Sequence, residues 1–189
     1  MDLFEYLLVI TSVIYALAIA QLLSGIGRLA QTEANVRRFL PHTLWVVILF
    51  VSVLLFWWAG WEFRTVEWAF PKYIYIMISP VFMFYSASLV IPVRMDEHDV
   101  RLEKHFLRIK RPVLWSFFIS LLAQFADGPV LAGEPIWFSG RVIQVTVLGI
   151  VIWGVFVEDR RLQAVTPVGV LLFMVFVGLT RLWTPGVIE

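Results

Sequence analysis

Asp127 is the residue whose type and position best suit chemistry. Gln124 lies three residues before it, so both side chains project from one face of a helix. Gly128 and Pro129 follow and interrupt that helix, because proline lacks the N–H group that a helix needs. A carboxylate beside an interrupted helix is an arrangement that binds ions and protons inside membranes. The pattern predicts a polar site at Asp127; the alternative is a solvated side chain at the membrane surface.

A carboxylate at that depth needs a compensating base, because removal from water disfavours its charged form. We expect this base to be Arg181, near the end of the last apolar run. Amides inside other apolar runs extend the predicted site, although each of them can instead bond to a neighbouring helix. The residues predicted to line a substrate or ion path are Gln21, Gln124, Asp127, Gln144 and Arg181.

The sequence lacks the signatures of enzymes and of metal sites. It contains no G-x-S-x-G, no phosphate-binding loop and no G-x-G-x-x-G. It has no Cys, which excludes disulfides, thiolate metal sites and a cysteine nucleophile. His98 and His105 are seven residues apart, which is about 10 Å along a helix, and His42 stands alone. We therefore expect no catalytic residue, no metal and no cofactor, and a protein that is not an enzyme.

Composition places the chain in a membrane. Hydrophobic residues make up 60% of the 189 residues and charged residues 15%, against about 45–50% and about 25% in soluble domains. The mean hydropathy is +0.85. So few charges cannot cover a soluble surface, so the sequence predicts an integral membrane protein in contact with the lipid bilayer. The net charge of +1 offers no basic surface for nucleic acid, which is therefore excluded as a partner.

Six apolar runs predict six membrane helices, because a bilayer core needs about 20 apolar residues of helix. The helices are expected at 4–27, 40–62, 73–93, 112–131, 141–157 and 162–183. Together they predict an all-α bundle that forms one transmembrane domain over residues 1–189. The segment 94–111 is expected to be a cytoplasmic loop or a short surface helix, since Leu102, Phe106 and Ile109 share one helical face.

The distribution of bases predicts the orientation of the bundle. Eleven of the 15 Lys and Arg residues fall in 28–38, 94–111 and 160–161. Loops rich in Lys and Arg stay in the cytoplasm. We therefore expect both termini on the periplasmic side of a bacterial inner membrane.

Two further clusters have alternative interpretations. Trp57, Trp58, Trp61 and Glu62 form an outer aromatic cluster, which is typical of a membrane interface and could also serve as a ligand platform. Small residues recur at helical spacing in the first helix, where they allow close approach of another helix. This stripe, which either packs within the chain or forms a seam between copies, consists of Ala16, Ala20, Ser24 and Gly27. We expect the chain to form a homo-oligomer.

The sequence LAIAQLLSGIGRL at 17–29 is similar to the first helix of a group of small bacterial integral membrane proteins of unknown function. In that group, as here, a basic turn follows, and then a helix that opens near His42 and Trp45 and closes on the pattern Trp57-Trp58-x-x-Trp61. The resemblance is good over residues 1–70 and holds only in outline beyond them. It implies a membrane protein and no particular activity.

Two classes of function remain open at this point. The first is an oligomeric transporter or channel for a small solute or ion, which uses the path of amides around Asp127. The second is a non-transporting membrane protein that assembles, senses or recruits a protein partner through its basic segment 94–111. Recurrent polar residues inside the helices favour the first class.

Overall fold

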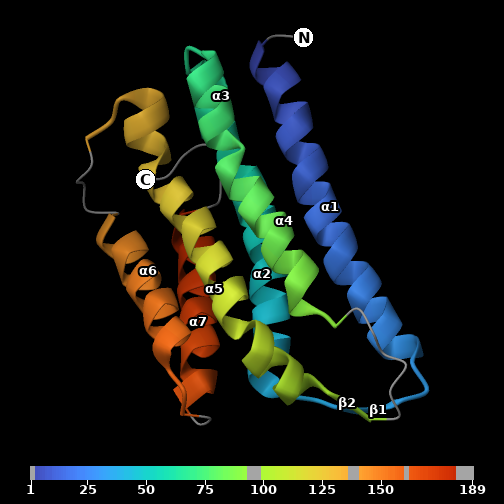
Figure 1. Cartoon of the computed structure of the whole chain (residues 1–189). Helices are drawn as coiled ribbons and strands as arrows, with labels where there is room; N and C mark the ends of the chain where they lie inside the picture. Colours follow the sequence, from blue (N-terminus) through green and yellow to red (C-terminus); the bar gives the residue numbers. More distant parts are fainter. Residues whose placement is uncertain (1–2, 93–98, 136–140, 160–161, 182–189) are drawn as a thin grey trace.

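Long apolar runs fold this chain almost entirely into helices (Figure 1). The computed structural model describes residues 3–92, 99–135, 141–159 and 162–181. The elements in chain order are α1 (Leu3–Gln31), β1 (Asn35–Arg37), α2 (Leu40–Ala59), the 3-10 helix η1 (Gly60–Thr65), α3 (Phe70–Ile76), α4 (Ile78–Val90), β2 (Asp99–Arg101), α5 (Leu102–Asp127), the π-helical turn η2 (Gly128–Ala132), α6 (Arg141–Phe156), the 3-10 turn η3 (Leu162–Ala164) and α7 (Val165–Arg181).

Several of these helices have the length and composition of membrane spans. Five described stretches have at least 18 residues and are apolar enough to cross a membrane: α1, α2 with η1, α3 with α4, α5 with η2, and η3 with α7. α6 is a shorter apolar helix. The predicted all-α class is thereby confirmed, and the helices fit a membrane protein.

The stretches run alternately up and down and pack side by side (Figure 1). One end of the bundle, here called the Asp127 end, holds the start of α1 together with η1, α3 and η2. The other end, the strand end, holds β1 and β2. The core between them is apolar and aromatic, and its largest fully buried side chains include Trp45, Phe106 and Phe117. Large apolar side chains such as Leu172 and Phe156 point outward, as lipid contact requires.

The structure corrects the prediction for 94–111. Residues 93–98 lie outside the described part, but α5 begins at Leu102 and continues without a break through Pro112. Leu102 and Phe106 are buried in the core rather than spread on a surface. Pro112 is exposed, so its ring lies on the outer face, and a proline is tolerated in a membrane helix where neighbours satisfy the freed carbonyl.

A short parallel pair of strands, which the sequence analysis did not predict, joins the α1–α2 connection to the start of α5. Asn35, Val36 and Arg37 lie opposite Asp99, Val100 and Arg101. Asp99 binds Arg101 at 2.9 Å and Arg37 at 3.2 Å. The hydrogen bond from Arg101 and the charge of Arg37 hold the pKa of Asp99 below its usual range.

The stripe of small residues on α1 does not pack inside the chain. Ala16, Ala20 and Ser24 are exposed, and a Cβ added at Gly27 would meet no atom within 4 Å. α1 packs on the bundle through its opposite face, where Gly25 lies directly against Ile91. The interpretation of the stripe as an intramolecular packing surface is therefore wrong.

Candidate functional site

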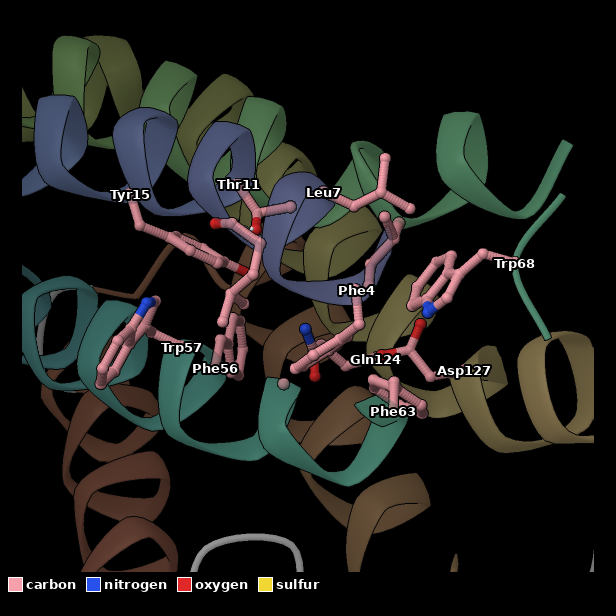
Figure 2. Close-up of a pocket in the computed structure, with 13 residues that line it drawn as sticks. Phe4, Leu7, Thr11, Tyr15, Phe56, Trp57, Phe63, Trp68, Gln124 and Asp127 are labelled. Atoms are coloured by element: carbon pink, nitrogen blue, oxygen red, sulfur yellow. Dashed lines mark hydrogen bonds between the residues drawn. The ribbon is translucent and has the colours of Figure 1, made fainter. Parts of the chain in front are cut away.

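A cavity of about 30 Å³ lies inside the Asp127 end (Figure 2). Side chains from α1, α2, η1, α3 and α5 surround it, together with Trp68 from the connection before α3. Its aromatic wall consists of Phe4, Phe56, Trp57, Phe63 and Trp68. Its polar wall consists of Thr11, Tyr15, Gln124 and Asp127. The sequence prediction thus placed Gln124 and Asp127 together correctly, on one face of a helix and at one cavity.

Asp127 is buried beside this cavity, with only 5% of its surface exposed. The charges of Glu62 and Arg141 act on its carboxylate, and Tyr75, whose hydroxyl donates to the carbonyl of Ala123, lies close by. In Figure 2 the indole nitrogen of Trp68 points toward the carboxylate. That nitrogen is buried and has no hydrogen-bond partner within the described residues.

The interruption at Pro129 explains why Arg141 lies here. Proline has no N–H, so the carbonyl of Phe125, four residues earlier, loses its helical donor. Arg141, the first residue of α6, donates to this carbonyl from Nη1 and also to the Gln144 Oε1 at 3.3 Å. Its guanidinium lies 4.9 Å from the centre of the Phe125 ring. The helix is therefore widened into the π-helical turn η2 rather than broken.

Other side chains fasten the same end of α5. Lys72 donates to the carbonyl of Leu131 at 2.8 Å, and Tyr75 donates to the carbonyl of Ala123 at 2.6 Å. Both donors come from α3. The position of Asp127 is thus held from two sides, by α3 and by α6.

A group of hydroxyls continues from the cavity into the bundle between α4 and α5. Gln124 Nε2 donates to Ser79 Oγ at 3.2 Å, and Tyr15 donates to the same oxygen at 3.4 Å. Ser79 and Ser120 are joined at 2.9 Å. Farther along, Ser116 bonds across to a carbonyl of α4, that of Phe82, at 2.7 Å. These bonds hold α4 against α5, since hydroxyls between membrane helices satisfy each other there.

The remaining predicted site residues lie elsewhere. Gln21 is exposed on α1, so it is not part of this cavity. Gln144 lies beside Arg141, at the edge of the site. The side chain of Arg181 lies outside the described residues, and its pairing with Asp127 stays a prediction. Among the described residues, Arg141 is a base whose charge acts on Asp127.

The outer aromatic cluster divides between the cavity and the surface. Trp57 lines the cavity and donates to Ser12 Oγ at 2.9 Å. Trp61 is exposed and packs edge-on against Phe4, with ring centres 6.1 Å apart. The indole nitrogen of Trp58 is buried without a partner among the described residues. Glu62 is partly exposed and reaches Asp127 only through its charge.

Sequence reasoning missed a polar group at the strand end. His42 and His105, which are 63 positions apart in the chain, both bond to the carbonyl of Val90, at 2.8 Å and 3.2 Å. Lys110 is buried and donates from Nζ to the carbonyl of Val157. These side chains complete the ends of α4 and α6, whose last carbonyls have no helical partner. Within the described residues no three His, Asp or Glu side chains converge as metal ligands.

Comparisons with protein-family models, with curated proteins and with solved structures find no match.

Proposed function

We propose that this chain is a six-span protein of a cell inner membrane that moves a small solute or ion through the Asp127 cavity. The observation that carries the proposal is a buried carboxylate, Asp127, beside a partly buried amide, Gln124, at a cavity among five elements. Ionisable side chains inside membrane helices are costly, and proteins retain them chiefly for ion or substrate binding.

A flux measurement on the reconstituted full chain tests this function. Proteoliposomes are mixed with isosmotic urea or glycerol and followed by light scattering, and separate samples are tested for uptake of sodium, rubidium and protons. We expect flux of at least one of these solutes above that of protein-free vesicles. Asp127→Asn should abolish it, whereas Glu67→Gln, the same chemical change at an exposed residue, should not. Flux equal to that of protein-free vesicles for every solute would overturn the proposal.

The proposed orientation puts the Asp127 end on the periplasmic side and the strand end in the cytoplasm. The exposed bases of the strand end support it, since loops rich in Lys and Arg remain inside. A cysteine at Glu67 should react with an impermeant maleimide in intact cells, and a cysteine at Lys104 should not. Both positions are exposed, and the chain has no other thiol. The reverse labelling pattern would contradict the orientation.

We further propose that copies of the chain associate through the exposed stripe of Ala16, Ala20, Ser24 and Gly27. Small residues let two membrane helices approach closely. Ala20→Leu should shift cross-linked protein in lipid from oligomer toward monomer. Ile26→Phe, which enlarges an exposed side chain about 120° around α1 from Ala20, is the control. An equal fraction of oligomer in both variants would contradict this seam.

The second candidate function is recruitment of a protein partner at the strand end. The observation that favours it is the group of exposed bases there, Arg37, Arg38, Arg101, Lys104 and Arg108. Because α5 includes residues 102–111, these bases stand on a fixed helix and a strand pair rather than on a separate loop. This alternative predicts no flux in the assay above. It also predicts that Asp127→Asn leaves recruitment of the partner unchanged.

A further inference from the structure

The size of the Asp127 cavity limits what can occupy it. A buried water needs about 10–15 Å³, so a volume of about 30 Å³ accepts two waters or one bare inorganic ion with a water. Sites for organic ligands have volumes of about 300–1,000 Å³. A sugar, an amino acid or a nucleotide is too large for this space.

The charge of the wall selects a cation. The carboxylate of Asp127 lines the cavity and is 5% exposed. The ion pairs that join described residues involve Asp99 and Glu158 instead, at the strand end. The charge of Arg141 acts on Asp127, and its Nη1 donates to Phe125 and Gln144. Burying a carboxylate that forms no ion pair with another described residue is expensive, and a cation inside the cavity lowers that cost.

The polar wall offers oxygen atoms to such a cation. Gln124 uses its Nε2 on Ser79, which leaves its Oε1 as an acceptor. Thr11 uses its hydroxyl hydrogen on the carbonyl of Leu8, so its oxygen lone pairs are also available. With Asp127 these groups supply one negative charge and two neutral oxygens. A single carboxylate balances one positive charge, so the wall suits a monovalent rather than a divalent ion.

We propose that the Asp127 cavity is a binding site for one small inorganic monovalent cation, either an alkali ion or a proton with its water, and that Asp127 is the counter-charge. This inference rests on the proposed transport function and names its substrate class. Gln124 and Thr11 are the additional ligands, and the aromatic wall excludes larger solutes.

Direct binding to the full chain in detergent tests the site. Sodium chloride and potassium chloride are titrated into the protein by calorimetry, with choline chloride at the same concentrations as the control for ionic strength. A pH titration followed by infrared spectroscopy reports the carbonyl band of a protonated carboxyl group. We expect either saturable heat with an alkali ion, or a carboxyl band that is lost in Asp127→Asn.

Matched variants separate the site from the fold. Asp127→Asn should remove the signal, and Gln124→Leu and Thr11→Ala should each weaken alkali-ion binding about three- to tenfold, as the loss of one neutral ligand predicts. Glu67→Gln should bind as the wild type does. If Asp127→Asn fails to fold, the two neutral variants decide the case of an alkali ion, and Asp127→Glu, which keeps a carboxyl group and should shift the carbonyl band, decides the case of a proton. Binding or protonation that is equal in wild type and all these variants would overturn the inference.

The two experiments distinguish failure of the cation site from failure of the proposed transport function. Flux of urea or glycerol that is independent of alkali ions and pH would leave transport standing and overturn the cation site. Cation binding that depends on Asp127, combined with no flux of any solute, would leave the site standing and overturn transport.

Discussion

Three charged side chains are buried in the described part of this protein, and their surroundings differ. Lys110, at the strand end, donates to the carbonyl of Val157, and Arg141, at the Asp127 end, donates to the carbonyl of Phe125. Each of these carbonyls lacks a donor from the helix to which it belongs. Both positive charges therefore supply hydrogen bonds to carbonyls that have lost a helical donor. Asp127 has the opposite sign, lies where α5 passes into η2, and faces a cavity. The two bases serve the structure, whereas the acid is a cost that the structure alone does not explain.

The largest expected effect is the difference in the free energy of unfolding between a variant of Lys110 and a variant of Asp127. Lys110→Met keeps the volume of the stem but leaves the carbonyl of Val157 without its donor, so it should lower the free energy of unfolding by about 1–3 kcal/mol. Asp127→Asn removes a buried charge and should leave stability unchanged or raise it. Both variants are compared by thermal unfolding in one detergent, with choline as the only added cation. A loss in Asp127→Asn as large as that in Lys110→Met would break the distinction between the two charges.

The sequence predicted part of this arrangement and missed the rest for physical reasons. The pairing of Gln124 with Asp127 follows from the helical repeat, which is local. The sequence analysis named Arg181 as the base, and its side chain lies outside the described residues. The sequence also contains a signal for Arg141 that the analysis did not use. Pro129 frees the carbonyl of Phe125, which then needs a donor, and Arg141 is the first base that follows in the chain.

The sequence also contains part of the signal for how far α5 extends. Leu102, Phe106, Val113 and Phe117 share one face across Pro112, and all four are buried. The predicted span began at Pro112, because the apolar run begins there and a segment rich in charged residues precedes it. The contact of His42 and His105 with one carbonyl has no local signal, since it depends on how the starts of α2 and α5 lie against the end of α4. The strand pair is likewise a long-range contact between two very short segments.

A double-mutant cycle compares the coupling of Asp127 to the two buried bases, and the expected effect on stability is smaller. Asp127 and Arg141 interact through their charges, so Asp127→Asn and Arg141→Gln should be non-additive by about 0.5–3 kcal/mol in the free energy of unfolding. Asp127→Asn and Lys110→Met, at opposite ends of the bundle, should add within about 0.5 kcal/mol. Urea or thermal unfolding of the single and double variants gives both coupling energies. Strict additivity for Asp127 with Arg141 would show that this base serves only the Phe125 carbonyl.

The smallest expected effect concerns Asp99, an acid that unlike Asp127 has two direct partners. Arg101 and Arg37 stabilise its charged form and hold its pKa below the ordinary value of 3.8. A lowered pKa means that the ion pairs contribute their full stability above pH 3.8 and lose it as the pH falls through the pKa of the folded state. The contribution is small, because both arginines are exposed to solvent.

Hydrogen exchange of the backbone amides in β1 and β2 is the measurement that resolves an effect of this size. In the wild type their protection should fall as the pH drops from 6 into the acid range, about pH 3. Asp99→Asn should show lower protection than the wild type at pH 6. Near pH 3 the protection of the two proteins should be equal, because the wild type has then lost the charge of Asp99 as well. A variant that keeps the wild-type difference between the two pH values would mean that another acid controls the strand pair.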